Sequence, residues 1–360
     1  MTYKWGDLIS LEYGKPVKDK AKKDGKYPVY GTNGQIGTSD LPPLCNHASI
    51  ILGRKGAYRG VHYSSTPFSV IDTAFYAVNL HPELLDIKWA YYKFLTYDIN
   101  SMDSGSAIPS TDRYEIYAIE VELPDTSVQE KQVQLLECFD DKILNLRQIN
   151  DNLQQQAKSL YEEMFLNNPD ADMVSGTLSD IATITMGQSP SGSSYNEESV
   201  GEVFYQGRAE FGFRFPTRRL FTTEPKRMAE PGDVLLSVRA PVGDLNVAYE
   251  KCCIGRGLGA IHSKTGDSSF MLYTMFALKP QLDVFNGEGT VFGSINRDGL
   301  SNLPVNIPSA EEIAKFEATV RPMDNLIRTN YEEICRLQSI RDSLLPKLMS
   351  GEIDVSDIQL

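Results

Sequence analysis

The chain has 360 residues, enough for two or more domains with their own cores, and its 41% hydrophobic and 23% charged content is ordinary for a globular protein. No apolar run approaches the roughly 18–20 residues of a membrane span and no basic-then-apolar leader opens the chain, so we expect no membrane partner and a cytoplasmic location. Of the net charge of −13, residues 125–174 carry −6 and residues 309–360 carry −4, so the rest is nearly neutral and a face of it could still be positive.

Residues 1–124 predict a first β-rich domain, because short β-type runs are separated by Gly, Pro and Asn turns. The expected elements are strands at 27–30, 49–52, 68–78 and 116–123, a helix at 84–97 and a small polar loop at 105–110. A lysine-rich loop that includes Lys15 and Lys18 is diluted by Asp19 and Asp24, so a solvated loop is the alternative to DNA contact.

Two turns of this domain are candidates for DNA contact. One is Gly31-Thr32-Asn33-Gly34, and the other follows a strand and presents Arg54 and Lys55 between Gly53 and Gly56. Glycine lets the backbone approach a phosphate closely, and arginine can reach a guanine edge with two hydrogen bonds. The alternative is that these cations are only solvated.

Residues 125–168 predict a first long helix, because apolar side chains recur at alternating spacings of three and four. No Gly or Pro interrupts residues 127–168. The expected pairing residues of this helix are Leu136, Phe139, Ile143, Leu146, Leu153 and Leu160. A polar linker is expected at 169–176.

Residues 177–308 repeat the first domain. Asp7 and Gly14 are matched by Asp180 and Gly187 at an offset of 173, and later matches lie at 184, so the second copy has eleven more residues. Most of the extra residues lie between Tyr205 and Leu235. Phenylalanines alternate there with arginines, among which the candidate DNA contacts are Arg208, Arg214, Arg218 and Arg219. This stretch could be a DNA-reading loop or an edge hairpin with a packed Phe face.

Arg239 of the second copy corresponds to the Arg54-Lys55 pair, either shifted by one residue or aligned with Lys55. Gly105-Ser106 of the first copy is matched by Gly289-Thr290 of the second. Ser106 and Thr290 therefore complete the candidate DNA contacts.

Residues 309–350 predict a second long helix, in which the same alternating spacing of apolar residues, the seam of the helix, returns at an offset of 184. Its expected pairing residues are Met323, Ile327, Ile334, Leu337, Leu344 and Leu348. The fold class is therefore α+β: two β-rich domains separated by a pair of long coiled-coil helices, as a pseudo-twofold internal repeat. The helices would be antiparallel if the domains sit at opposite ends, and Asn150 and Asn330 could then face each other. Residues 351–360 are expected to form a C-terminal tail.

No catalytic or metal-binding motif stands out. There is no Gly-x-x-x-x-Gly-Lys-Ser/Thr loop, no Ser-His-Asp set and no Cys-x-x-Cys, and Asn168-Pro169 lacks the aromatic continuation that an amino-methyltransferase uses. The five cysteines are an odd number, which suits free thiols. The chain is predicted to bind rather than to catalyse.

Several segments together resemble the specificity subunit of type I restriction–modification enzymes. They are Gly105-Ser106-Ala107-Ile108-Pro109-Ser110 running to Leu123-Pro124, Glu230-Pro231-Gly232-Asp233-Val234-Leu235-Leu236-Ser237-Val238-Arg239, and Leu344-Leu345-Pro346-Lys347-Leu348-Met349-Ser350-Gly351-Glu352-Ile353. The resemblance covers essentially the whole chain. It implies that each β-rich domain is a target-recognition domain that reads one half of a bipartite double-stranded DNA target, and that the helices set the gap between the half-sites.

The resemblance also implies partners. Methyltransferase subunits that bind S-adenosylmethionine would dock on the helices, and a restriction/translocase subunit would bring ATP and Mg. The chain itself would bind no cofactor or metal and would be non-catalytic. Alternatives are the specificity subunit of a bipartite type II-like restriction–methylation enzyme and a two-headed scaffold that binds protein or carbohydrate.

Overall fold

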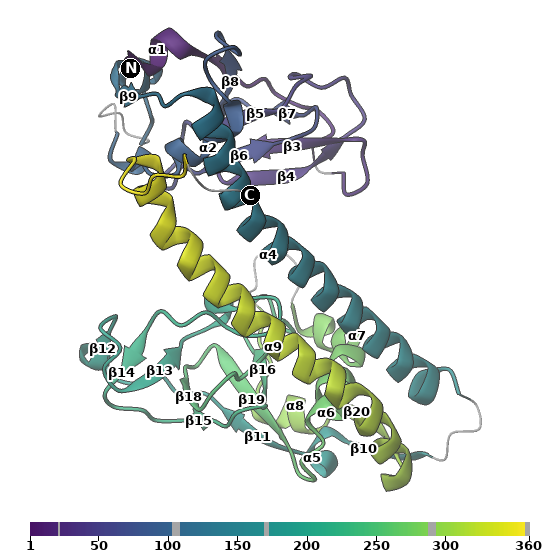
Figure 1. The fold of residues 1–360 in the computed structure, drawn as a ribbon. Coiled ribbons are helices and arrows are strands. Elements are labelled where there is room, and N and C mark those ends of the chain that lie inside the picture. The colour runs from purple at the N-terminus through teal and green to yellow at the C-terminus, as the bar shows by residue number, and fades with distance from the viewer. Residues whose placement is uncertain (21, 103–108, 169–172, 287–292, 357–360) are drawn as a thin grey trace. The chain divides into compact units, whose positions relative to one another are not determined.

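The computed structural model describes residues 1–20, 22–102, 109–168, 173–286 and 293–356 (Figure 1). The chain divides into two compact units, Met1–Leu146 with Glu332–Leu360, and Arg147–Tyr331. Each unit holds one β-rich head together with a stretch of both long helices. The boundary between the units therefore falls inside the helices, whereas the sequence predicted boundaries at the helix ends.

The head of the first unit is built on an antiparallel sheet with the strand order β2-β8-β5-β6, next to a sheet of order β4-β3-β7 and a ladder of β1 with β9. Its strands are β1 (Thr2–Lys4), β2 (Ile9–Tyr13), β3 (Tyr27–Gly31), β4 (Gly34–Ser39), β5 (Ser49–Gly53), β6 (Val61–Ser64), β7 (Ser69–Val70), β8 (Ala74–Asn79) and β9 (Glu120–Glu122). Its helices are α1 (Trp5–Leu8), α2 (Ile87–Phe94) and α3 (Arg113–Ala118), with a 3-10 turn at Ile99–Ser101. Trp5 and Trp89 are fully buried in the core between the sheet and the helices.

The head of the second unit repeats this plan with the order β11-β19-β16-β17, a sheet β12-β14-β13-β18-β15 and a ladder of β10 with β20. Its strands are β10 (Met173–Thr177), β11 (Ala182–Met186), β12 (Tyr195–Asn196), β13 (Glu202–Tyr205), β14 (Phe221–Thr222), β15 (Met228–Ala229), β16 (Val234–Ser237), β17 (Leu245–Val247), β18 (Cys252–Ile254), β19 (Leu258–Ser263) and β20 (Pro304–Pro308). Its helices are α5 (Leu178–Ile181), α6 (Ser268–Ala277), α7 (Lys279–Asp283) and α8 (Arg297–Ser301), with 3-10 turns at Gly192–Ser194, Arg208–Glu210 and Val284–Asn286.

The repeat extends to single backbone hydrogen bonds. The Trp5 amide donates to Ile119 at 3.1 Å, and the Leu178 amide donates to Leu303 at 2.9 Å, which are the same two positions at offsets of 173 and 184. The two heads therefore share a common core, as the offsets in the sequence predicted.

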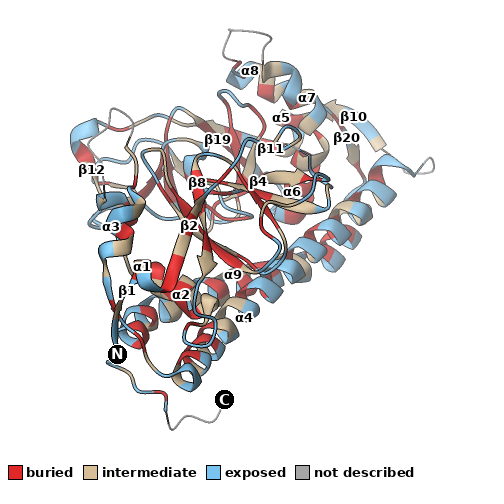
Figure 2. Cartoon of the chain, turned by 90° about the horizontal axis from the view of Figure 1, so that it is seen from above, coloured by how far each residue is buried: buried red, intermediate tan, exposed pale blue. Residues whose placement is uncertain are grey.

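The long helices are α4 (Thr126–Tyr161), continued by a π-helical turn at Glu162–Leu166, and α9 (Ala310–Met349). They run antiparallel in each unit. In the first unit Arg341 donates to Asp140 at 2.6 Å, and in the second Asn330 Nδ2 donates to Asn150 Oδ1 at 2.8 Å. The contact expected between the two asparagines is confirmed, and Figure 2 shows each helix buried along one side and exposed along the other.

The expected pairing residues all lie on the buried sides of the helices. Six are buried and six are partly buried: Leu136, Ile143, Leu146, Ile327, Ile334 and Leu348, then Phe139, Leu153, Leu160, Met323, Leu337 and Leu344. In the first unit Ile143, Leu146 and Ile334 form a cluster between the helices. Leu160 and Met323 pack against the core of the second unit.

Four expected elements differ from the structure. The helix expected at 84–97 is only α2, because the Asp86 carboxylate caps its first turn by accepting from the Lys88 and Trp89 amides. The run 68–78 is two strands, β7 and β8, separated by a turn. The run 116–123 is the end of α3 followed by β9, and the linker expected at 169–176 includes most of β10, which pairs with β20.

Candidate nucleic-acid interface

In the first head, the turn that carries Arg54 and Lys55 is bridged to the segment 109–111. The Gly56 amide donates to Pro109 at 3.0 Å and the Thr111 amide donates to Arg54 at 2.9 Å. Thr32 Oγ1 lies 2.7 Å from the Lys55 carbonyl oxygen and so holds the same turn in place. Because its hydroxyl is engaged with backbone oxygens, Thr32 positions the turn, whereas Asn33 is exposed beside it.

The Arg54 guanidinium lies over the rings of Tyr13 and Phe75. Its guanidinium carbon is 4.8 Å from the ring centroid of Tyr13, and its Nη1 donates to the Asp72 carbonyl oxygen at 2.9 Å. The guanidinium carbon of Arg113 lies over the same ring, 5.1 Å from its centroid. Tyr13 and Arg113 were not among the predicted site residues. They are far apart in the sequence, and only the fold brings them together, at the end of β2 and the start of α3.

The second head contains the same bridge. The Ala240 amide donates to Gly293 and the Ile295 amide donates to Val238, both at 3.0 Å, so every donor and acceptor is displaced by 184 residues from its counterpart. Lys55 pairs with Ser110 across the first bridge, and Arg239 pairs with Ser294 across the second. This register aligns Arg239 with Lys55, and the counterpart of Arg54 is the buried Val238.

A groove of about 680 Å³ opens at this place in the second head. It is lined by Met186, Gly187, Val238, Arg239, Ala240, Arg256, Gly293, Ser294, Ile295 and Asn296. Arg239 and Arg256 are exposed, and neither side chain has a carboxylate partner among the residues that the structure describes. Arg256 was not among the predicted DNA contacts, because a single arginine between Gly255 and Gly257 carries no pattern in the sequence that marks a binding residue.

Three of the predicted arginines in the extra stretch form ion pairs inside the second unit. Arg208 pairs with Asp244, Arg218 with Glu250, and Arg219 with Glu210 at 2.6 Å. All three remain exposed, so DNA contact by Arg208, Arg218 and Arg219 stays a prediction.

The prediction that Arg214 contacts DNA is wrong. Its residue is only 4% exposed, and its guanidinium donates to Asp324 at 2.7 Å, Gln154 at 3.1 Å and Tyr273 at 3.2 Å. Burial lowers the pKa of Arg214, but Asp324 and Tyr273 outweigh burial and hold the pKa above its ordinary value. Arg214 anchors the extra stretch to both long helices, and the neighbouring Phe215 packs on Tyr249 and Tyr331 with ring centroids 5.5 and 5.0 Å away.

The remaining predicted residues lie apart from the bridge or outside the described part of the chain. Lys15 and Lys18 are exposed on the loop after β2. Ser106 and Thr290 lie outside the described residues. Within the described ranges there is no cluster of three side chains that could hold a metal, and no helix there is long and apolar enough to cross a membrane.

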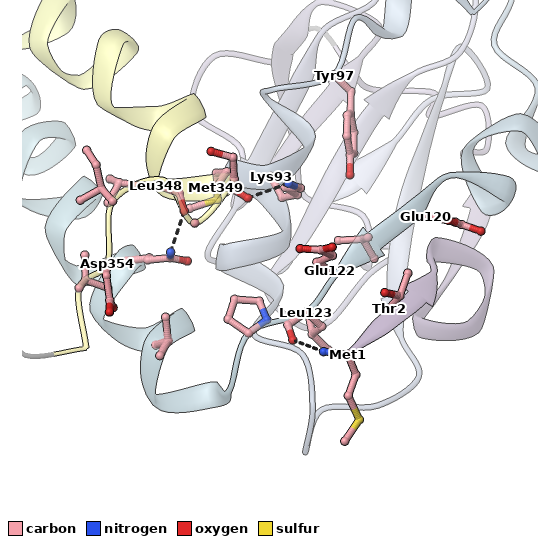
Figure 3. Close-up of a pocket in the computed structure, with 18 residues that line it drawn as sticks. Met1, Thr2, Lys93, Tyr97, Glu120, Glu122, Leu123, Leu348, Met349 and Asp354 are labelled. Atoms are coloured by element: carbon pink, nitrogen blue, oxygen red, sulfur yellow. Dashed lines mark hydrogen bonds between the residues drawn. The ribbon is translucent and has the colours of Figure 1, made fainter.

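A second hollow, of about 690 Å³, lies in the first unit where α2, α4 and the end of α9 meet (Figure 3). Lys93 Nζ donates to the Met349 carbonyl oxygen and Gln132 Nε2 donates to that of Leu348, both at 2.7 Å. Val355 of the tail is buried in the same core, and Lys131 donates to Ser356. The described part of the tail therefore packs on the start of α4, and burial lowers the pKa of Lys93.

The sequence matches the family model of the type I restriction modification DNA specificity domain twice, over residues 1–155 and 171–336. The putative type I restriction enzyme MjaX specificity subunit of Methanocaldococcus jannaschii is 30% identical over 264 residues, which cover 68% of this chain and 62% of that protein. The MjaIX specificity subunit of the same organism is 22% identical over 307 residues, 75% of this chain and 70% of that protein. The chain thus spans less than two thirds of the length of the first of these relatives.

The fold has a counterpart among solved structures. The S subunit of a type I restriction–modification system from M. genitalium superposes with a TM-score of 0.61 at 18% identity, covering 97% of this chain and 95% of that one. The duplicated family match and the two heads with equivalent bridges agree with one another. The chain belongs to the family of type I restriction–modification DNA specificity proteins.

Proposed function

We propose that this chain is the non-catalytic specificity subunit of a DNA-modifying complex and that each head reads one half of a bipartite duplex target. The observation that carries the proposal is the bridge that recurs in both heads, Lys55 with Ser110 and Arg239 with Ser294. The same backbone arrangement occurs in both heads, with a cation at the same position and different side chains around it. This arrangement suits two related domains that recognise two different half-sites.

The charge of the chain supports this division of roles. The helical stretches carry most of the net negative charge, whereas the heads are nearly neutral and each has a cation at its bridge, Lys55 or Arg239. Because attraction to phosphate depends on the charge near the contact rather than on the net charge, a nearly neutral head with a cation at its bridge can bind DNA in a chain whose overall charge is −13.

The long helices suit the docking of protein partners. They leave apolar side chains exposed in both units, Leu144 and Ile340 in the first and Ile149 and Leu326 in the second. In this proposal methyltransferase subunits cover these side chains and bring S-adenosylmethionine. A restriction/translocase subunit, with ATP and Mg, joins the same complex, and the helices set the distance between the half-sites.

Methylation mapping in cells that carry this chain with its methyltransferase subunits tests the proposal. We expect one bipartite sequence to be methylated. Lys55→Ala should weaken methylation by loosening the hold on the half-site of the first head, and Arg239→Ala should do so for the other half-site. Methylation with no sequence preference would overturn the proposal, and unchanged methylation in both variants would show that the bridges do not contact DNA.

A further inference from the structure

The turn before β8 in the first head is equivalent to the turn before β19 in the second head. In the first head the Ile71 amide donates to Tyr30 at 2.9 Å, and in the second the Gly255 amide donates to Tyr205 at 2.8 Å. On the other side of the turn, the Gly14 amide donates to Ala74 at 3.1 Å and the Gly187 amide donates to Leu258 at 2.9 Å. Between these bonds lie Asp72 and Thr73 in the first head and Arg256 and Gly257 in the second, so Asp72 and Arg256 occupy the same place.

The two side chains at this place have opposite charges. Asp72 and Arg256 are both exposed, and neither charged group has an ionic partner among the residues that the structure describes. Arg256 lines the groove next to the bridge. Asp72 lies next to the bridge of its own head, since its carbonyl oxygen accepts from Arg54, the neighbour of Lys55. Neither charge is needed to neutralise another charge of the fold.

The sign of a charge separates the two kinds of DNA contact. A phosphate has the same charge in every half-site, so an ionic contact to phosphate that both heads share requires a cation in both. Lys55 and Arg239 meet this requirement. A carboxylate would be repelled by phosphate, so the position of Asp72 and Arg256 cannot be a shared backbone contact.

We infer that Asp72 and Arg256 are base-reading residues of the two heads, and that Lys55 and Arg239 hold the phosphate backbone beside them. This inference rests on the proposed function. Arg256 has the two parallel donors that match O6 and N7 of guanine, whereas the Asp72 carboxylate accepts from the amino group of cytosine. The half-site of the second head should therefore contain a guanine at the contacted position, and that of the first head a cytosine.

The test is selection from a randomised duplex DNA library by the purified complex of this chain with its methyltransferase subunits. The unsubstituted complex should select two half-sites. Arg256→Ala should lose discrimination at one guanine by about 10- to 100-fold and keep every other preference. Arg256→Lys should recover only part of it, because an ammonium lacks the planar pair of donors. Asp72→Asn should change the preference in the opposite half-site.

Two further variants separate base reading from charge alone. Arg239→Ala should weaken binding to all sequences and lower the salt dependence by about one phosphate contact. Lys226→Ala, an exposed cation of the same unit that does not line the groove, should leave the selected sequence unchanged. If Arg256→Ala instead lowers affinity uniformly with every base preference intact, Arg256 is a phosphate contact and the inference is overturned. If the unsubstituted complex selects no sequence, the proposed function fails and the inference fails with it.

Discussion

At the scale of single residues, the two units neutralise equivalent aspartates with arginines from different places. Asp140 accepts from Tyr92 at 2.7 Å and from Arg341 of α9, and Asp324 accepts from Tyr273 at 3.1 Å and from Arg214 of the extra stretch. The residue 184 positions before Arg341 is Ala157, which carries no charge. The extra stretch of the second copy therefore supplies a cation that the first long helix does not.

Because Arg214 supplies the cation that neutralises Asp324, we predict that Arg214 is important for stability. Arg214→Ala should lower the free energy of unfolding by about 3–5 kcal/mol, because it leaves the mostly buried Asp324 without its cation. Urea denaturation measures this, with Arg218→Ala as the matched control, since the Arg218 ion pair is largely exposed and is worth about 0–1 kcal/mol. Equal losses in the two variants would refute the anchoring role, and Arg214→Met with Asp324→Leu should regain much of the lost stability.

The buried position of Arg214 also shows why the candidate nucleic-acid interface could be predicted only in part. The sequence does not distinguish Arg214 from the three other arginines, Arg208, Arg218 and Arg219. Only Arg214 points inward, toward a carboxylate that lies 110 residues further along the chain, so its orientation could not be predicted from its neighbours. The Lys55 and Arg239 positions could be predicted, since both copies repeat them. Arg256 could not, because a change of charge at an equivalent position has meaning only after the turns have been aligned by their hydrogen bonds.

At the scale of elements, the long helices were predictable and the short ones were not. Apolar residues at alternating spacings of three and four specify α4 before any tertiary contact is known. The six residues of α3 contain too few turns for a helical period, and the Asp112 carboxylate, which accepts from the Tyr114 amide, decides where that helix starts. The boundaries of short elements thus depend on capping, whereas those of long elements depend on the pattern of burial.

The buried asparagine pair at the middle of the helix seam gives an element-scale prediction. Asn330→Leu should lower the free energy of unfolding by about 1–3 kcal/mol, because it leaves the buried amide of Asn150 without a partner. Replacing both residues with leucine should restore stability to at least the original value, since no polar group is then left unpaired. Thermal and chemical denaturation measure both effects. A double variant no more stable than the single one would show that the amide contact is not the cause.

At the scale of the whole molecule, each unit joins a head to stretches of both helices, so α4 and α9 each contribute to both units. Each head packs directly on the helices: Trp89 donates to Gln132 at 2.6 Å in the first unit, and the Phe270 amide donates to Glu317 at 2.8 Å in the second. A head is thus fixed to the helix stretch beside it. Under the proposed function, lengthening the helices between these attachment points should change the spacing of the half-sites without changing the half-sites themselves.

The last prediction follows from helix geometry. One added heptad in each long helix, placed after Leu146 and before Glu332 where the units divide, adds about 10 Å of helix at 1.5 Å per residue. The gap should therefore widen by at most about three base pairs at 3.4 Å each. A full heptad keeps the apolar seam in register, whereas the control, an insertion of three residues in each helix, breaks it and should lower stability. Methylation mapping measures the gap, and an unchanged gap in a folded, active heptad variant would show that the helices do not set the spacing.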